Sequence, residues 1–176
     1  MKIEEIVEPF ILDLQEMFGT EIPTTWSTDG DDNIIGRLTI NDDQFKIVLE
    51  RAVYKDHKFI NIAFQIWDEQ GQMWSEEATL DNKKASTIIG AIINAVSKEL
   101  QKHEYDALVF AAGTLVDKRM RIYNKIASSY TKKFGGIRQN IPLKNGGACS
   151  LVCTKEFLNG NAVDDVIDEI ASKIDK

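Results

Sequence analysis

The chain has 176 residues, of which 43% are apolar and 28% are charged, and its formal net charge is −7. This length and composition predict a single globular domain over residues 1–176, large enough to form its core without a metal or a disulfide. No apolar run approaches the roughly 18 residues that a membrane span requires, and no signal peptide is apparent. We therefore expect neither a membrane protein nor an exported one.

The two cysteines, Cys149 and Cys153, lie in one predicted strand. Four residues of strand place their Cα atoms roughly 13 Å apart, whereas a disulfide requires less than about 7 Å. We therefore expect reduced thiols that pack in the strand, and a cytoplasmic protein. With only two histidines, His57 and His103, and no C-x-x-C pair, the sequence argues against a zinc site.

The first half of the chain predicts a helix followed by an antiparallel meander. Apolar residues at helical spacing predict a helix over residues 2–17, and the connector 19–32 contains a short strand around Trp26 and a polar turn. Strands with alternating apolar residues are then expected over residues 34–40, 45–49, 60–66 and 73–80. On the outer face of this meander, Trp67 and Trp74 are expected to line a groove or to pack under a helix.

The second half of the chain predicts helices that alternate with strands. A helix that Asp81 can cap is followed by a short apolar strand of the buried kind and by a second, basic helix. The expected elements are a helix Asn82–His103, a strand Ala107–Ala112, a helix Val116–Phe134, a hairpin of strands Ile137–Leu143 and Ala148–Thr154, and a helix Asn161–Ile174. The predicted fold class is therefore α+β, with an antiparallel meander of three or four strands followed by helix, strand, helix, strand pair and helix.

The stretch Ala107–Gly136 carries a family resemblance. Its strand reads ALVFAA, its helix contains R-M-R-I-Y-N-K-I, and the helix ends near FGG. This stretch and the order of the predicted elements resemble the GCN5-related N-acetyltransferases, which have a helical N-terminal region, an antiparallel meander, a helix, a strand, a second helix and a closing strand pair. The stretch is also similar to small bacteriophage proteins of unassigned function with an R-x-x-x-Y-x-x-(I/L)-A helix after an apolar strand. The resemblance implies an acetyltransferase-like fold.

The resemblance also implies a catalytic residue. In this acetyltransferase family, a tyrosine on the second helix can serve as the general acid toward the departing thiolate of coenzyme A. Tyr123 occupies the matching position, and a phenol can protonate a thiolate as it leaves. Because Tyr123 also lies on the apolar stripe of its helix, the other interpretation is that it is a core residue.

The family's site for the pyrophosphate of coenzyme A is missing here. Family members bind it with a Gln/Arg-x-x-Gly-x-Gly/Ala loop, whose glycines allow close approach of the backbone. The equivalent residues 80–86 include no glycine, and Asp81 would repel a phosphate. Lys83 and Lys84 can attract an anion only as point charges.

We therefore expect a non-catalytic accessory or binding protein of the phage type, with a protein partner and no cofactor. If a phage encodes it, the protein is expected in the host cytoplasm or on the virion. The alternative is an N-acyltransferase that binds acetyl-CoA in an atypical site and uses Tyr123 as its acid.

Positive charge is concentrated in the middle of the sequence. Residues 81–145 carry 12 basic and five acidic side chains, net +7, whereas residues 1–80 carry six basic and 17 acidic side chains, net −11. The simpler interpretation is electrostatic complementarity within the fold, and the other is a cationic patch for an anionic ligand. The residues predicted to bind an anion or ligand are Lys83, Lys84, Arg119, Arg121 and Lys125.

The basic residues of the helix 118–133, Arg119 among them, are expected to lie largely off its buried stripe. A basic helix surface of this kind would suit the phosphates of a nucleic acid. Nucleic-acid binding through this helix is therefore a further alternative, which the overall acidity of the chain disfavours.

Overall fold

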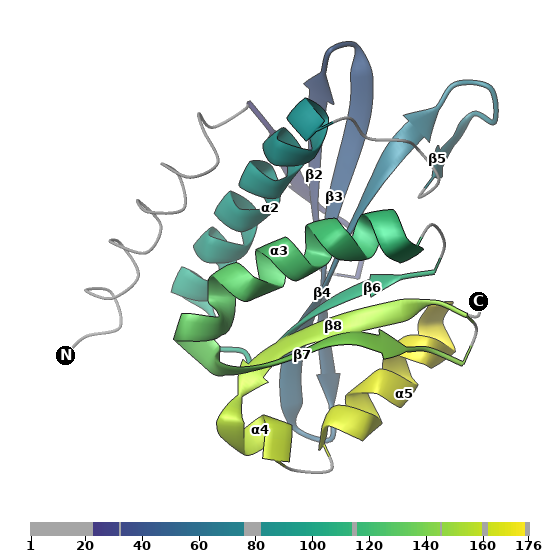
Figure 1. Cartoon of the computed structure of the whole chain (residues 1–176). Helices are drawn as coiled ribbons and strands as arrows, with labels where there is room; N and C mark the ends of the chain where they lie inside the picture. The colour runs from purple at the N-terminus through teal and green to yellow at the C-terminus, as the bar shows by residue number, and fades with distance from the viewer. Residues whose placement is uncertain are drawn as a thin grey trace.

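The computed structural model describes residues 23–31, 33–75, 82–113, 116–144, 146–159 and 162–174. These residues form an α+β fold with one mixed, eight-stranded sheet and helices on both of its faces (Figure 1). The strands are β1 (Thr25–Thr28), β2 (Ile34–Ile40), β3 (Asp43–Tyr54), β4 (His57–Asp68), β5 (Met73–Ser75), β6 (Ala107–Ala112), β7 (Gly135–Pro142) and β8 (Ala148–Thr154). The helices are α2 (Asn82–Lys102), α3 (Val116–Phe134), α4 (Lys155–Asn159) and α5 (Ala162–Ile174). The helix predicted over residues 2–17 and the cap predicted at Asp81 lie outside the described residues.

The strands follow the order β1-β2-β3-β4-β6-β8-β7, and β5 pairs with β4. The predicted antiparallel meander is confirmed, because β1 to β4 pair consecutively in antiparallel fashion. Among the described strands, β4 and β6 form the one parallel pair, which joins Phe59–Ile62 to Ala107–Phe110. α2 makes the crossover between these two strands, as a parallel connection requires. The predicted closing hairpin is confirmed as the antiparallel pair β7 and β8.

Tight turns join the long strands of the meander. Asn41 and Asp42, between β2 and β3, both have positive φ, at 48° and 71°. Lys55 and Asp56, between β3 and β4, adopt the same conformation at 46° and 68°. Two residues with positive φ form the turn whose twist matches that of the flanking strands. These turns therefore fix the register in which β2, β3 and β4 pair.

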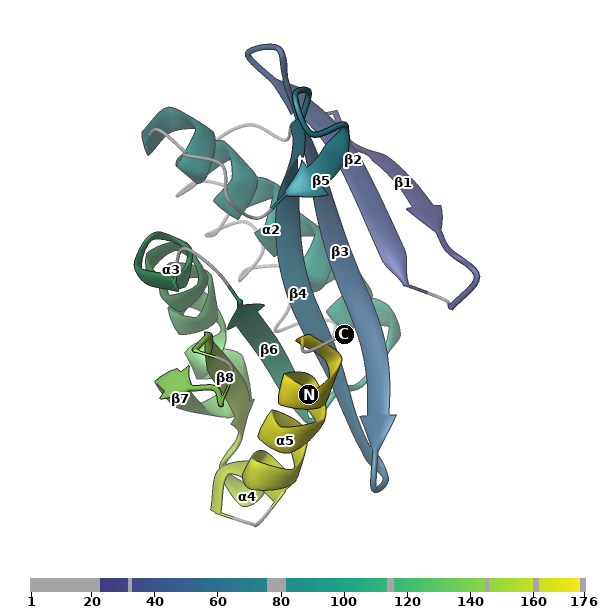
Figure 2. The same ribbon diagram turned by 90° about the vertical axis from the view of Figure 1, so that its right-hand side faces the viewer.

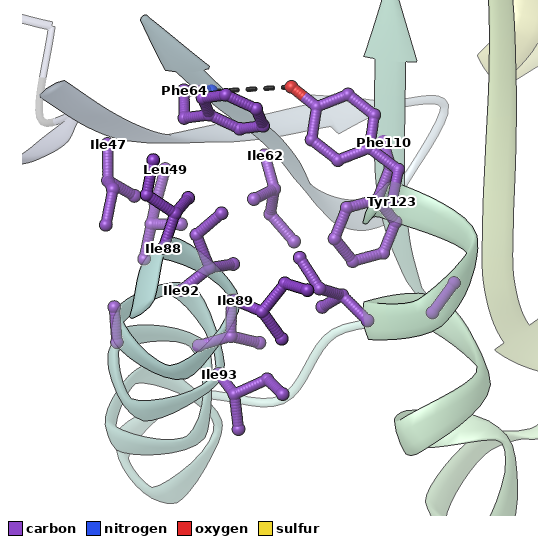
Figure 3. Close-up of a cluster of buried hydrophobic side chains, with 14 of the residues drawn as sticks. Ile47, Leu49, Ile62, Phe64, Ile88, Ile89, Ile92, Ile93, Phe110 and Tyr123 are labelled. Atoms are coloured by element: carbon purple, nitrogen blue, oxygen red, sulfur yellow. Dashed lines mark hydrogen bonds between the residues drawn. The ribbon is translucent and has the colours of Figure 1, made fainter. Parts of the chain in front are cut away.

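Two cores lie on opposite faces of the sheet. On one face, α2 and α3 cover the inward side chains of β2, β3 and β4 (Figure 3), where Ile47 and Phe64 of the sheet and Ile92 of α2 are buried. On the other face, α4 and α5 cover β6, β8 and the hairpin end of β3 and β4 (Figure 2), where Phe157 and Val166 are buried. Because both faces of β6 are covered, all six of its residues are buried. This explains its uniformly apolar sequence.

The helix α4 was not predicted from the sequence. It begins directly after β8, where the Thr154 hydroxyl accepts a hydrogen bond of 3.2 Å from the N–H of Phe157. A threonine hydroxyl in this position caps the first turn of a helix. With only five residues, α4 has too few turns to show a helical period in the sequence.

Candidate functional site

The junction between β4, β6 and α3 is the part of the structure to which the resemblance assigns catalysis. The parallel pairing of β4 with β6 ends at Ile62 and Phe110. β4 continues to Asp68, and its last residues pair with β5 instead. Beyond Ile62, therefore, the backbone groups of β4 that point away from β3 need partners other than β6.

Two side chains of α3 supply these partners at Phe64. The Arg119 guanidinium donates a hydrogen bond of 2.5 Å to the Phe64 carbonyl, and its central carbon lies 4.2 Å from the centroid of the Phe64 ring. The Tyr123 hydroxyl accepts a hydrogen bond of 3.4 Å from the Phe64 N–H (Figure 3). Both polar groups of the Phe64 backbone are thus satisfied by the helix that crosses the junction.

Arg119 occupies a place that the sequence did not predict. Its exposed fraction is 3%, so the prediction that it lies off the buried stripe of α3 is wrong. The reason is the length of the side chain, which reaches from the edge of the stripe to the carbonyl of Phe64. Its charge is directed into the fold instead of toward solvent.

Tyr123 is held between the rings of two phenylalanines. Its exposed fraction is 0%, and its ring meets Phe64 edge to face at 5.6 Å and Phe110 at 5.7 Å between centroids (Figure 3). A departing thiolate could reach the hydroxyl only if the contact between α3 and β4 opened. In the closed structure, Tyr123 acts as a core residue with a hydrogen-bonded hydroxyl.

The other predicted ligand-binding residues have different surroundings. The Lys84 ammonium pairs with the carboxylate of Asp43, which ties the start of α2 to the start of β3. The side chain of Lys83 lies outside the described residues. Arg121 and Lys125 are exposed and one helical turn apart on α3. The structure therefore brings Arg121 and Lys125 together and gives Lys84 and Arg119 other partners.

A polar network beside α3 was not predicted from the sequence. The Asn124 side chain donates to Asn140 at 2.8 Å, the Asn140 N–H donates to the Ser150 hydroxyl at 3.1 Å, and Ser150 donates to Asn124 at 2.6 Å. The network lies at an irregularity between Arg138 and Ile141, where Asn140 has a φ of 54°. An asparagine tolerates this conformation better than most residues, so Asn140 was the available signal for a bulge.

The cysteines of β8 are free and buried. Burial raises the pKa of the Cys149 thiol to about 12, although the positive charge of Arg138 lowers it in part. The same causes raise the pKa of Cys153 to about 11. A thiol with so high a pKa is a poor nucleophile near neutral pH, because the thiolate is the reactive form.

Comparisons with known proteins assign no function to the chain. The chain matches no family model, and searches among curated proteins and solved structures found no match. Within the described ranges, no group of three or more His, Cys, Asp or Glu side chains is placed to hold a metal ion. None of the described helices has the length and apolar character needed to cross a membrane.

Proposed function

We propose that this protein acts by binding and not by catalysis, on a fold that resembles the acetyltransferases. The order of its elements supports the resemblance: an antiparallel meander precedes α2, β6, α3 and the closing pair of β7 and β8. The sequence before α2 lacks the glycines with which that family binds the pyrophosphate of coenzyme A.

One observation carries the proposal, namely the double hydrogen bonding of Phe64 by Arg119 and Tyr123. An acyl-CoA donor would have to place its thiolate beside the Tyr123 hydroxyl, in the junction that these side chains fill. Its entry would break both hydrogen bonds in a buried place. Each buried polar group left without a partner costs about 1–3 kcal/mol, so entry of the donor is opposed by the fold itself.

The surface that best suits a partner is the exposed basic side of α3. Arg121 and Lys125 lie on it, and Lys132 and Lys133 are exposed near the end of the same helix. In a protein of net charge −7, such a local excess of positive charge favours an acidic protein surface as the partner.

The test of the non-catalytic proposal is release of free thiol from acetyl-CoA in the presence of a panel of primary amines. We expect no release above the rate in buffer. Saturable turnover that falls about 100-fold or more in Tyr123→Phe would overturn the proposal, because a general acid contributes at least that factor. The variant's circular dichroism should match that of the parent chain, so that lost turnover is not lost folding.

The test of the partner surface uses a labelled acidic peptide and a labelled single-stranded oligonucleotide of equal charge. We expect the peptide to bind, and charge reversal at Arg121 and Lys125 to abolish binding. Reversal of Lys144, whose side chain is 88% exposed at the turn between β7 and β8, is the matched control outside α3 and should leave binding unchanged. Preferential binding of the oligonucleotide, weakening steeply with salt, would instead support the nucleic-acid alternative.

A further inference from the structure

The outer face of the meander contains a cleft on the side of the sheet opposite to Arg119 and Tyr123. Its volume is about 420 Å³, and residues of β1, β2, β3 and β5 line it together with Pro23. Figure 2 shows this side of the sheet, where α5 covers the other end of β3 and β4. The volume falls in the range of roughly 300–1,000 Å³ that is typical of small-molecule sites.

Two basic residues are paired across neighbouring strands at the cleft. Arg37 lines it, and Lys46 is the direct partner of Arg37 across the pair of β2 and β3. No carboxylate of the described residues forms an ion pair with either side chain. Like charges directly opposite each other destabilise an antiparallel pair. Partial burial and the charge of Arg37 both lower the pKa of Lys46, which agrees with a cation that lacks an acidic neighbour.

An aromatic wall stands beside these cations. Trp74 of β5 lines the cleft, and the Lys46 ammonium lies 4.9 Å from the centroid of its ring. Trp67 supports Trp74 edge to face, with 5.4 Å between the ring centroids. Thr25, Thr39 and Gln44 add hydroxyl and amide groups to the lining. The lining of the cleft therefore combines a flat apolar wall, the charge of Arg37 and neutral hydrogen-bonding groups, and the Lys46 ammonium lies beside it over the Trp74 ring.

We propose that this cleft binds a small organic phosphate that carries a planar ring, as a nucleoside monophosphate does. A phosphate monoester is close to a dianion at neutral pH, so it neutralises Arg37 and Lys46 together. The arginine fork matches phosphate oxygens in pairs. The indole of Trp74 offers a surface for the ring. Two basic residues paired directly across two strands suit one compact dianion better than the spaced carboxylates of an acidic peptide.

The inference goes beyond the proposed function, because it involves a different face of the sheet and none of the residues of α3. Calorimetric titration of the whole chain with AMP, ribose 5-phosphate, inorganic phosphate and adenosine tests it. We expect saturable binding of AMP, weaker binding of ribose 5-phosphate and none of adenosine. Absence of binding by all three phosphates, or adenosine binding as tight as AMP, would overturn the proposal.

Variants locate the site. Lys46→Met and Arg37→Gln should each weaken AMP binding about tenfold or more, since each removes a charged partner of the phosphate. Trp74→Leu should weaken AMP binding and leave ribose 5-phosphate binding within about twofold. The control is Lys58→Gln, which removes an exposed charge at the far end of β4. Equal losses in Lys46→Met and Lys58→Gln would refute a defined site. Arg37 is exposed, so its variant keeps the test valid if Lys46→Met folds poorly.

Measurements with acetyl-CoA distinguish this inference from the proposed function. Acetyl-CoA carries a nucleoside phosphate, as AMP does, so it is a potential ligand of the cleft as well as an acyl donor. Acetyl-CoA binding that Lys46→Met abolishes belongs to the cleft and supports the inference. Acetyl-CoA turnover that Lys46→Met leaves intact contradicts the non-catalytic proposal alone. Binding of an acidic peptide at Lys46 without any binding of AMP would overturn the ligand class named here.

Discussion

The Glu99 carboxylate accepts two hydrogen bonds from the Arg51 guanidinium, at 2.7 Å from Nε and at 3.1 Å from Nη2. A third, of 2.6 Å, comes from the Tyr105 hydroxyl. Glu99 belongs to α2 and Arg51 to β3, so this pair ties the end of the helix to the sheet. The exposed fraction of the Glu99 side chain is 4%, whereas that of Arg51 is 34%. A charge this well buried is stable only while its partners remain.

Acid should weaken this contact. Burial alone would raise the pKa of Glu99, but the hydrogen bonds from Arg51 and Tyr105 outweigh it and hold the pKa below its ordinary value of 4.5. Because the folded pKa is depressed, the stabilisation is fully present above pH 4.5 and is lost as the pH falls through the lower, folded value. Urea unfolding of the parent chain should therefore show a decline below that pH which is smaller in Glu99→Gln.

At neutral pH, Glu99→Gln should reduce the free energy of unfolding by about 1–3 kcal/mol, because a buried, charge-assisted hydrogen-bonded pair is lost. The control is Glu104→Gln, an exposed site close to the same end of α2. Its effect should stay within about 0.5 kcal/mol. Equal effects of the two substitutions would show that the pair with Arg51 contributes nothing specific.

Removing the Arg119 guanidinium should lower the free energy of unfolding more than removing the Tyr123 hydroxyl. Arg119→Met leaves the Phe64 carbonyl without this donor and should cost about 1.5–3 kcal/mol in urea unfolding. Tyr123→Phe removes one neutral acceptor and should cost about 1 kcal/mol. Arg121→Met, on the exposed side of α3, should change stability by less than about 0.5 kcal/mol. A loss in Arg121→Met as large as that in Arg119→Met would contradict the assigned contact.

Gly36 should not tolerate a methyl group. A Cβ at this position would lie closer than 3.0 Å to three ring atoms of Trp26, which packs across β2 from the neighbouring β1. Gly36→Ala must therefore displace the indole and should cost about 1–3 kcal/mol. Gly30→Ala is the matched control, because a Cβ there meets no atom within 4 Å. Thermal unfolding, together with a shift in tryptophan fluorescence for Gly36→Ala alone, checks the prediction.

The thiols of β8 should react slowly in the folded chain. Burial raises the pKa of Cys149 to about 12 and that of Cys153 to about 11. At pH 8 the reactive thiolate is therefore scarce, and both sulfur atoms are also shielded from reagent. A thiol reagent such as DTNB should modify both cysteines only at the rate of unfolding, and at once in denaturant. Rapid modification of Cys149 in the native chain would point to an activated nucleophile.

Elements with strong periodic or compositional signals were predicted well from the sequence. The limits of β6 and α3 agree with the prediction, because six consecutive apolar residues precede Gly113 and because the apolar stripe of α3 repeats regularly up to Phe134. The fourth strand of the meander is present as Met73–Ser75, and the rest of its predicted range, residues 76–80, lies outside the described residues.

The contacts at the candidate sites depend on pairing between distant segments. Arg119 was assigned to the surface because helical spacing gives the direction of a residue and not the reach of its side chain. Its acceptor, the Phe64 carbonyl, is available only because β4 and β6 stop pairing at Ile62. By contrast, the pairing of Arg37 with Lys46 follows from the two-residue turn at Asn41 and Asp42, so the sequence contained a usable signal for the cleft.

The position of β6 in the sheet matters for a chain that is still being synthesised. The strands β1 to β4 find their partners among near neighbours in sequence, but β6 pairs with β4 on one edge and with β8 on the other. The second partner ends only at Thr154. Until then, an apolar strand presents unpaired backbone groups that could recruit another chain. A nascent or truncated chain that stops before Ala148 should therefore aggregate, whereas one that extends past Thr154 can close the edge within itself.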